Sequence, residues 1–148
     1  MSAFSARSLA ALDGVHPTLV QLAKEITEFF DCSVIDGTRT VAQQVENIKK
    51  GLSQTMNSLH IVQKDGYGHA IDVAPTPQQW DNSPQSNLTK YEVECIAFLF
   101  YFKGYAKAKD IDVRIGADWN GNNLWQDNNF NDLDHIELPL DSKSDAST

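Results

Sequence analysis

Histidine and aspartate side chains recur in three short segments of this chain, and a fold that uses them together must bring those segments to one place. His60 stands in the first segment, Asp72 in the second, and the third carries both Asp132 and His135. Two histidines and one carboxylate suit a catalytic zinc site, in which three protein ligands leave the fourth tetrahedral position open. We therefore expect the segments at residues 58–60, 68–72 and 132–135 to meet.

Strand periodicity indicates how the second and third segments meet. Ile71 and Val73 alternate with Asp72, so a strand here buries the two apolar side chains and presents Asp72 to the opposite face. Ile136 and His135 alternate in the same way near the C-terminus. The pattern predicts that Asp72 and His135 share one face of one sheet.

The third ligand is either His60 or His69. His69 is an odd number of positions from Asp72, so within one strand their side chains point to opposite faces. His60 is therefore the preferred ligand, and His69 is the alternative. His16 stands directly before Pro17 and is interpreted as a surface or hydrogen-bonded histidine.

The remaining patterns predict one small α+β domain with a mainly antiparallel sheet packed with helices. A chain of 148 residues with 41% hydrophobic content is long enough for a single core. The irregular alternation of helical and strand periodicity does not fit a regular parallel sheet. Residues 1–140 are assigned to this domain, and residues 141–148 are expected to form a disordered tail. Helices are expected after Pro17, Thr40 and Thr89, the last running toward Gly104, and strands at 33–35, 71–73, 111–115 and 135–138.

Charge and hydropathy exclude several classes of partner. A net charge of -8 disfavours binding to nucleic acid or to an anionic membrane through a basic surface. No apolar run approaches the roughly 20 residues needed to span a bilayer. Asp13 and Gly14 interrupt the N-terminal segment, so we expect no signal peptide and synthesis in the cytoplasm. Cys32 and Cys95 are expected to be buried free thiols.

The three segments together resemble a family of zinc peptidases. It includes bacterial D-Ala-D-Ala dipeptidases and carboxypeptidases and phage L-alanyl-D-glutamate endopeptidases, with the signature Ser-x-His-x-x-Gly-x-Ala-x-Asp followed by Glu or Asp-x-x-His. Residues 58–60 and 68–72 supply the first part, and residues 132–135 supply the second. Residues 14–17, 36–43 and 116–120 extend the resemblance, and the last two segments are similar to the phage endolysin branch.

One departure from the signature follows His60. Residues 61–67 separate it from Gly68, where the short form of the signature has only two residues. Asp65 and Gly66 form a turn signal within this insertion. We therefore expect the insertion to loop out and to leave His60 beside Asp72.

The resemblance implies a D,D-peptidase/hedgehog-like fold and assigns roles to five residues. His60, Asp72 and His135 would hold Zn²⁺, and Asp132 would be the general base in a position where many relatives have Glu. Arg39 would stabilise the negative charge that develops on the scissile carbonyl oxygen. A salt bridge that closes the turn is the alternative interpretation of Arg39.

Other side chains are candidates for substrate contact or for support of the ligands. Glu137 shares a face with His135, so it is the rival general base, an outer partner of the metal or a substrate-positioning group. Ser58 would bind substrate or fix the loop before the first ligand, and Trp119 would form part of the wall. Asp134 is expected to point away from the site.

The implied activity is zinc-dependent hydrolysis of the peptidoglycan stem peptide, between L-Ala and D-Glu. One alternative is a D-Ala-D-Ala carboxypeptidase or dipeptidase with the same metal chemistry. The other is a non-catalytic, zinc-stabilised wall-binding module, against which Asp132 argues because a structural metal site needs no positioned base. The resemblance further implies a monomer that acts on bacterial peptidoglycan. As an endolysin, it would accumulate in the host cytoplasm before release to the cell wall.

Overall fold

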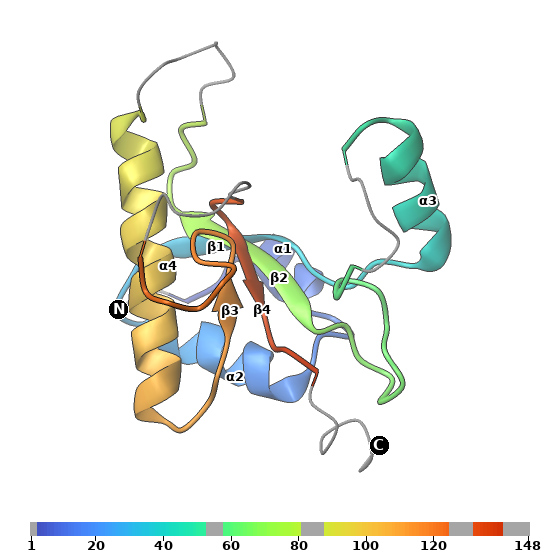
Figure 1. Ribbon diagram of the computed structural model, residues 1–148, viewed down its shortest axis with the longest axis horizontal. Coiled ribbons are helices and arrows are strands. Elements are labelled where there is room, and N and C mark those ends of the chain that lie inside the picture. Colours follow the sequence, from blue (N-terminus) through green and yellow to red (C-terminus); the bar gives the residue numbers. More distant parts are fainter. Residues whose placement is uncertain (1–2, 53–57, 81–87, 125–131, 141–148) are drawn as a thin grey trace.

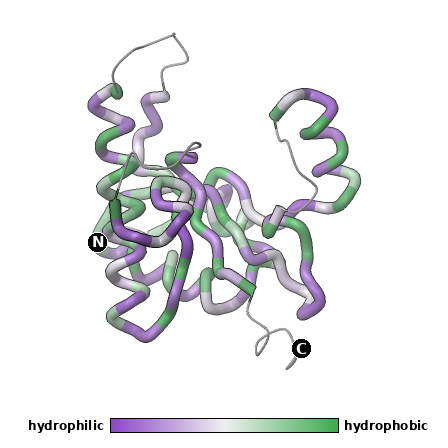
Figure 2. The backbone as a smooth tube through the Cα atoms, in the orientation of Figure 1, coloured by the Kyte–Doolittle hydropathy of each residue, from purple (hydrophilic) through white to green (hydrophobic). Residues whose placement is uncertain are grey.

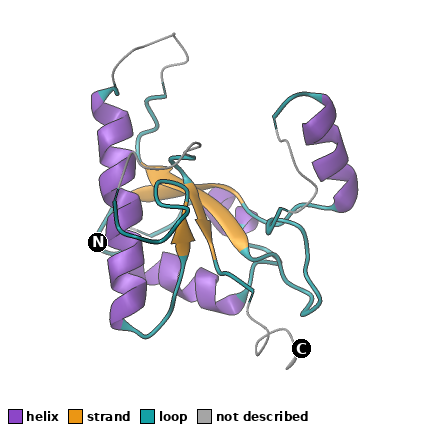
Figure 3. Cartoon of the chain, viewed as in Figure 1, coloured by secondary structure: helices purple, strands orange, loops and turns teal. Residues whose placement is uncertain are grey.

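A four-stranded antiparallel sheet of order β1-β2-β4-β3 organises the chain (Figure 1). The computed structural model describes residues 3–52, 58–80, 88–124 and 132–140, so the tail 141–148 lies outside the described residues. Helices and strands follow one another irregularly along the chain (Figure 3), which confirms the predicted α+β class. The elements are α1 (Ala6–Ala11), α2 (Pro17–Ile26), β1 (Cys32–Asp36), α3 (Val41–Lys49), β2 (Ala70–Pro75), α4 (Lys90–Ala108), β3 (Arg114–Ile115) and β4 (His135–Glu137).

Helices α2, α3 and α4 begin where the sequence predicts, whereas α1 was not predicted. Thr40 and Thr89 each form a complete capping box with the residue three positions later, at the start of α3 and α4. Pro17 occupies the first turn of α2. Helix α4 continues past Gly104 to Ala108, because a glycine inside a helix costs only about 1 kcal/mol and the buried face continues at Ala106.

The strand predicted at residues 111–115 is shorter in the structure. Only Arg114 and Ile115 pair with β4. Arg114 lies opposite Glu137, the last residue of β4, so the residues before Arg114 have no strand partner there. Val113 is nevertheless buried and Ile111 packs against the core. Alternation therefore predicted the burial of these side chains correctly but overestimated the length of the ladder.

The core lies between one face of the sheet and helices α2 and α4. Hydrophobic positions recur along both helices in alternation with hydrophilic ones (Figure 2). Helix α3 stands apart from the other elements (Figure 1), and Gln44 is its buried residue. None of the described helices is long and apolar enough to cross a membrane. The largest fully buried apolar side chains are Phe98, Phe102, Leu19, Leu22, Ile26, Ile71, Leu99, Ile115, Ile136 and Val73.

A close backbone approach at Gly116 seats the segment that precedes β4. The Asp132 amide donates to the Gly116 carbonyl oxygen at 2.8 Å, and the Gly116 amide donates to the His135 carbonyl oxygen at 2.8 Å. A Cβ atom at position 116 would lie 1.8 Å from the Asp132 carbonyl oxygen. Only glycine therefore fits at this position without moving Asp132.

The Gly116→Ala substitution is expected to destabilise the fold by about 1–3 kcal/mol, because the added methyl group forces the backbone at Asp132 to shift. Thermal unfolding measures the effect. Gly104→Ala is the matched control, since a Cβ there meets nothing within 4 Å and alanine favours the helix by about 1 kcal/mol. Equal melting temperatures for Gly116→Ala and the unsubstituted chain would contradict the close approach.

Candidate metal centre and catalytic site

Strands β2 and β4 present Asp72 and His135 as direct cross-strand partners. Their neighbours Ile71 and Ile136 also pair with each other and are fully buried in the core. The two polar side chains therefore emerge together on the other face of the sheet, as alternation predicts. Nδ1 of His135 lies 3.4 Å from Oδ1 of Asp72.

His60 reaches the same carboxylate from the loop before β2. Its amide donates to Oγ of Ser58 at 3.2 Å, and its carbonyl oxygen accepts from the Arg39 amide at 2.8 Å. Its ring donates from Nδ1 to the Gly37 carbonyl oxygen at 2.7 Å. Nε2, the other ring nitrogen, lies 3.3 Å from Oδ1 of Asp72. The bond between the His60 amide and Ser58 corresponds to one of the two roles expected for Ser58, that of fixing the loop before the first predicted ligand.

The three side chains offer ligand atoms within 4.8 Å of one another, and the distances from Asp72 to both histidines match the edges of a tetrahedral metal centre. A tetrahedron with metal–ligand bonds of about 2.0–2.1 Å has edges of about 3.3–3.4 Å. His60 and His135 lie at 3.3 and 3.4 Å from Oδ1 of Asp72. That oxygen is buried and has no hydrogen-bond partner among the described residues. A buried, unpaired carboxylate oxygen facing two imidazole nitrogens fits a cation such as Zn²⁺.

The insertion after His60 forms a hairpin closed on itself. The Gln63 amide donates to the Tyr67 carbonyl oxygen at 2.9 Å, and the Gly66 amide donates to the Gln63 carbonyl oxygen at 2.9 Å. Gly66 adopts a φ of 86°, which glycine accommodates readily. Val62 and Gly68 then form a bridge that brings the two ends together. The insertion therefore loops out, as expected, and does not separate the two ligand-bearing segments in space.

His69, the alternative ligand, faces a different group of side chains. Its Nε2 lies 2.6 Å from Oδ2 of Asp65, within the inserted hairpin. The His16 ring packs against it with the ring centroids 4.9 Å apart. His16, expected to be a surface or hydrogen-bonded histidine, accepts a hydrogen bond from the Thr18 amide at the start of α2.

Glu137 contacts the His135 ring nitrogen that faces away from Asp72. Nε2 of His135 lies 2.8 Å from Oε1 of Glu137, while Arg114 donates from Nε and Nη2 to Oε2 at 2.9 and 2.6 Å. Burial alone would raise the pKa of Glu137, but its hydrogen bonds to His135 and Arg114 outweigh burial and lower it. Because both carboxylate oxygens are engaged within the protein, the geometry favours an orienting role over that of general base.

The Glu137→Gln substitution is expected to weaken zinc binding about 10–100-fold, since it removes the carboxylate that orients His135 and raises its basicity. Competition with a chromophoric chelator measures the affinity. Glu46→Gln, on the exposed face of α3, is the control with the same charge change and is expected to bind zinc as the unsubstituted chain does. An unchanged affinity in Glu137→Gln would contradict the orienting role.

Three carboxylates crowd together beside the two histidines. Oxygen atoms of Asp72, Asp132 and Asp134 all lie within 4.8 Å of one another. The expectation that Asp134 points away from the site was therefore wrong. Asp134 lies in the turn before β4 and its carbonyl oxygen accepts from the Val73 amide, so strand alternation does not govern its side chain. Burial, a hydrogen bond with Asp132 and the charge of Asp72 raise the pKa of Asp134.

Positive charge is favoured between Asp72 and its histidine partners. Burial would raise the pKa of Asp72, yet its contacts with His135 and His60 outweigh burial and lower it. Burial would likewise lower the pKa of His135, but Asp72 and Glu137 raise it to about 9. A proton or a metal cation at this position satisfies the same carboxylate, and the two compete because a ligating imidazole must be deprotonated.

Arg39 lies at the edge of the cluster, on the predicted turn between β1 and α3. Its Nε and Nη2 bind Oδ2 of Asp36 at 2.8 and 2.7 Å, and Nη1 donates to Oε1 of Gln44 at 3.0 Å. Nη2 also lies 3.7 Å from Oδ2 of Asp72. The ion pair that closes the turn is thus present, and it holds the guanidinium beside the carboxylate of the predicted ligand Asp72.

Trp119 forms one side of the cluster. The centroid of its ring lies 5.1 Å from that of the His135 ring, at an interplanar angle of 35°. The centroids of the His60 and His135 rings are 5.2 Å apart. The neighbouring Asp118 is buried and paired with Lys103 at 2.8 Å. The predicted wall residue therefore contacts a predicted ligand, in a turn held by the ion pair between Lys103 and the buried Asp118.

Comparisons with known proteins point to one family. The model of a family described as phage L-alanyl-D-glutamate peptidase matches residues 1–139. The L-alanyl-D-glutamate peptidase of Escherichia phage T5 is 30% identical over 146 residues, covering 91% of this chain and 96% of that protein. The crystal structure of the Serratia marcescens L-Ala D-Glu endopeptidase ChiX matches with a TM-score of 0.66 at 28% identity, covering 93% of this chain and 90% of that one.

Proposed function

Because the chain belongs to the phage L-alanyl-D-glutamate peptidase family, we propose that it hydrolyses the peptidoglycan stem peptide between L-Ala and D-Glu with a zinc ion. The chain is a peptidase of this family, and the names of both relatives specify the same bond. The observation that carries the zinc proposal is the convergence of ligand atoms of His60, Asp72 and His135 within 4.8 Å, with both histidines at a tetrahedral edge length from Asp72.

In this proposal His60 binds the ion through Nε2, His135 through Nδ1 and Asp72 through Oδ1. Each imidazole is oriented by a bond from its other nitrogen, to the Gly37 carbonyl oxygen or to Glu137. The unpaired Oδ1 of Asp72 gains the partner that it lacks among the described residues. A bound zinc ion supplies a Lewis acid and lowers the pKa of water to about 7.

Asp132 is the proposed general base. Its carboxylate belongs to the group that includes the ligand Asp72, and the close approach at Gly116 fixes its backbone. A carboxylate in reach can take a proton from the attacking water and pass it to the leaving amine. Asp134 lies beside Asp132, where burial, a hydrogen bond with Asp132 and the charge of Asp72 raise the pKa of Asp134.

Arg39 is the proposed electrostatic partner of the substrate. A stem peptide that contains D-Glu is acidic, and the net charge of -8 gives this protein no long-range attraction for it. The guanidinium is held by Asp36 and lies 3.7 Å from Asp72, so it supplies local positive charge at the cluster. There it can stabilise the developing oxyanion.

The remaining parts of the proposal concern substrate contact and the cellular setting. Trp119 offers an aromatic wall beside His135 for the substrate, and Ser58 acts through the loop that carries His60. The protein acts as a monomer on bacterial peptidoglycan, without nucleic acid or membrane as partner. As an endolysin it accumulates in the host cytoplasm and acts after release to the cell wall.

Digestion of purified peptidoglycan followed by mass spectrometry of the new termini tests the proposed bond. Zinc-loaded protein is expected to generate N-terminal D-Glu, and removal of zinc by a chelator should abolish the reaction until zinc is restored. Release of D-Ala instead would indicate a carboxypeptidase. No cleavage by fully zinc-loaded protein would overturn the proposal.

A further inference from the structure

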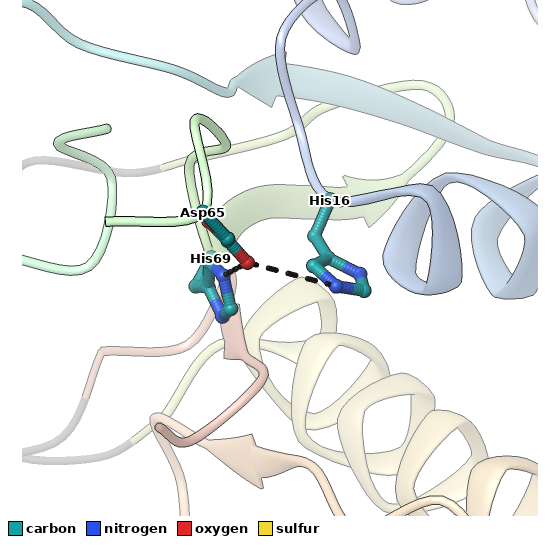
Figure 4. Close-up of side chains that lie close together, drawn as sticks. All are labelled: His16, Asp65 and His69. Carbon is teal, nitrogen blue, oxygen red and sulfur yellow. Dashed lines mark hydrogen bonds and ion pairs between the residues drawn. The ribbon is translucent and has the colours of Figure 1, made fainter. Parts of the chain in front are cut away.

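A second group of histidine and aspartate side chains lies at the inserted hairpin. Figure 4 shows His16, directly before α2, directed toward Asp65 and His69 from the hairpin and the start of β2. Nε2 of His69 lies 2.6 Å from Oδ2 of Asp65, and Nε2 of His16 lies 3.8 Å from the same oxygen. The side chains of Asp65 and His69 are only 9% and 3% exposed. The composition of this cluster therefore resembles that of the metal centre.

Its distances differ from those of a metal centre. A separation of 2.6 Å is well below the tetrahedral edge of about 3.3–3.4 Å and is typical of a charge-assisted hydrogen bond. His16 cannot complete a metal site in its observed state. Its Nδ1 accepts from the Thr18 amide at 3.1 Å, so the neutral ring carries its proton on Nε2, the nitrogen that faces Asp65.

The acceptors around His69 define its protonation state. Nδ1 lies 3.2 Å from the Leu138 carbonyl oxygen, and Nε2 lies 2.6 Å from Oδ2 of Asp65. A carbonyl oxygen and an ionised carboxylate only accept hydrogen bonds, so both ring nitrogens must donate. Burial would raise the pKa of Asp65, but its bonds to His69 and to the Tyr67 amide lower it and keep the carboxylate ionised.

The backbone of His69 is hydrogen-bonded to residues next to two of the proposed ligand-bearing segments. Its amide donates to the Leu59 carbonyl oxygen at 2.7 Å, directly before His60, and its carbonyl oxygen accepts from the Leu138 amide at 2.8 Å. Asp65 accepts from the Tyr67 amide through Oδ1 at 3.0 Å and so belongs rigidly to the turn of the hairpin. A bond between Asp65 and His69 therefore ties the hairpin to a residue whose backbone is bonded to Leu59, directly before His60, and to Leu138, directly after β4.

We propose that His69 is an imidazolium that clasps the inserted hairpin through Asp65, and that both are positioning residues for His60. The titratable groups that face His69 are Asp65 from the hairpin and His16 from the start of α2. The positively charged ring of His69 is balanced by Asp65, while Nε2 of His16 lies 3.8 Å from the same oxygen, beyond hydrogen-bond distance. The effect on His60 rests on the proposed zinc function, whereas the charge state of His69 does not.

Nitrogen-15 NMR of the imidazole rings tests the clasp directly. In the unsubstituted protein both nitrogens of His69 are expected to show the shifts of protonated nitrogen, at a pH where Asp65→Asn shows only one protonated nitrogen. Asp65→Asn is also expected to weaken zinc binding about tenfold through the displaced loop. Asp112→Asn is the control with the same charge change on an exposed side chain, and it should alter neither quantity.

Two results would overturn the clasp. One is a single protonated nitrogen on His69 in the unsubstituted protein, a measurement that needs no variant to fold. The other is a zinc content of two ions per chain that falls to one in Asp65→Asn, which would make the cluster a cation site. Loss of the proposed peptidase function would appear differently, as absent zinc or absent cleavage with the His69 signature intact.

Discussion

Replacing Asp132 by asparagine is expected to lower kcat about 10²–10⁴-fold while zinc stays bound. The amide keeps the shape of the side chain but cannot accept a proton, so the general-base contribution is lost. The three proposed ligands, His60, Asp72 and His135, remain in place because the Asp132 backbone is held by its contacts with Gly116. Zinc content by elemental analysis and the rate of appearance of N-terminal D-Glu give the two readouts.

Asp134→Asn is the matched control for that substitution. Asp134 lies in the same carboxylate group, but its raised pKa means that it already carries a proton near neutral pH. An amide reproduces a protonated carboxyl more closely than an ionised one, so we expect a loss of less than about tenfold in kcat. Full activity in Asp132→Asn, or a larger loss in Asp134→Asn, would move the base away from Asp132.

Replacing His135 by alanine is expected to abolish both zinc binding and activity. The substitution removes Nδ1, which lies 3.4 Å from Oδ1 of Asp72, and leaves Glu137 without the ring that it orients. Loss of a ligand should exceed the 10–100-fold effect of losing an outer partner, so zinc should dissociate at micromolar protein concentrations. Elemental analysis after dialysis measures the bound metal, and circular dichroism verifies that the fold persists.

His69→Ala is the matched histidine control. Its side chain faces Asp65 rather than Asp72, so the variant should retain zinc with an affinity lowered only about tenfold by loss of the clasp. Complete loss of zinc in His69→Ala together with retention in His60→Ala would restore the alternative ligand set. Retention of stoichiometric zinc in His135→Ala would remove the proposed centre altogether.

Local periodicity and turn chemistry were sufficient to predict how the proposed ligands approach one another. Alternation of Ile71 with Asp72, and of Ile136 with His135, predicts a shared face because side chains along a strand have a period of two. The Asp65-Gly66 turn predicts that the insertion folds back on itself. These features depend on neighbouring residues in the chain, and sequence patterns report such features well.

Features that depend on tertiary contacts could not be predicted in the same way. Asp134 joins the carboxylate group because a turn, whose side chains follow no strand period, orients it. The partnership of Glu137 with Arg114 requires the pairing of β3 with β4, which links residues far apart in sequence. The length of a strand likewise depends on the strand that it pairs with. For this reason β3 is shorter than the alternation of apolar and polar residues suggests.

The self-contained hairpin at residues 61–67 uncouples separation along the chain from separation in space. Its ends are joined at Val62 and Gly68, so His60 lies 3.3 Å from Asp72 although the inserted residues separate the two in sequence. A search pattern with a fixed interval between those two positions will therefore overlook proteins of this kind. A pattern that allows a variable interval with a turn dipeptide in it would recover them. Each recovered insertion can then be examined for a side-chain contact that holds it to the residues beside β2.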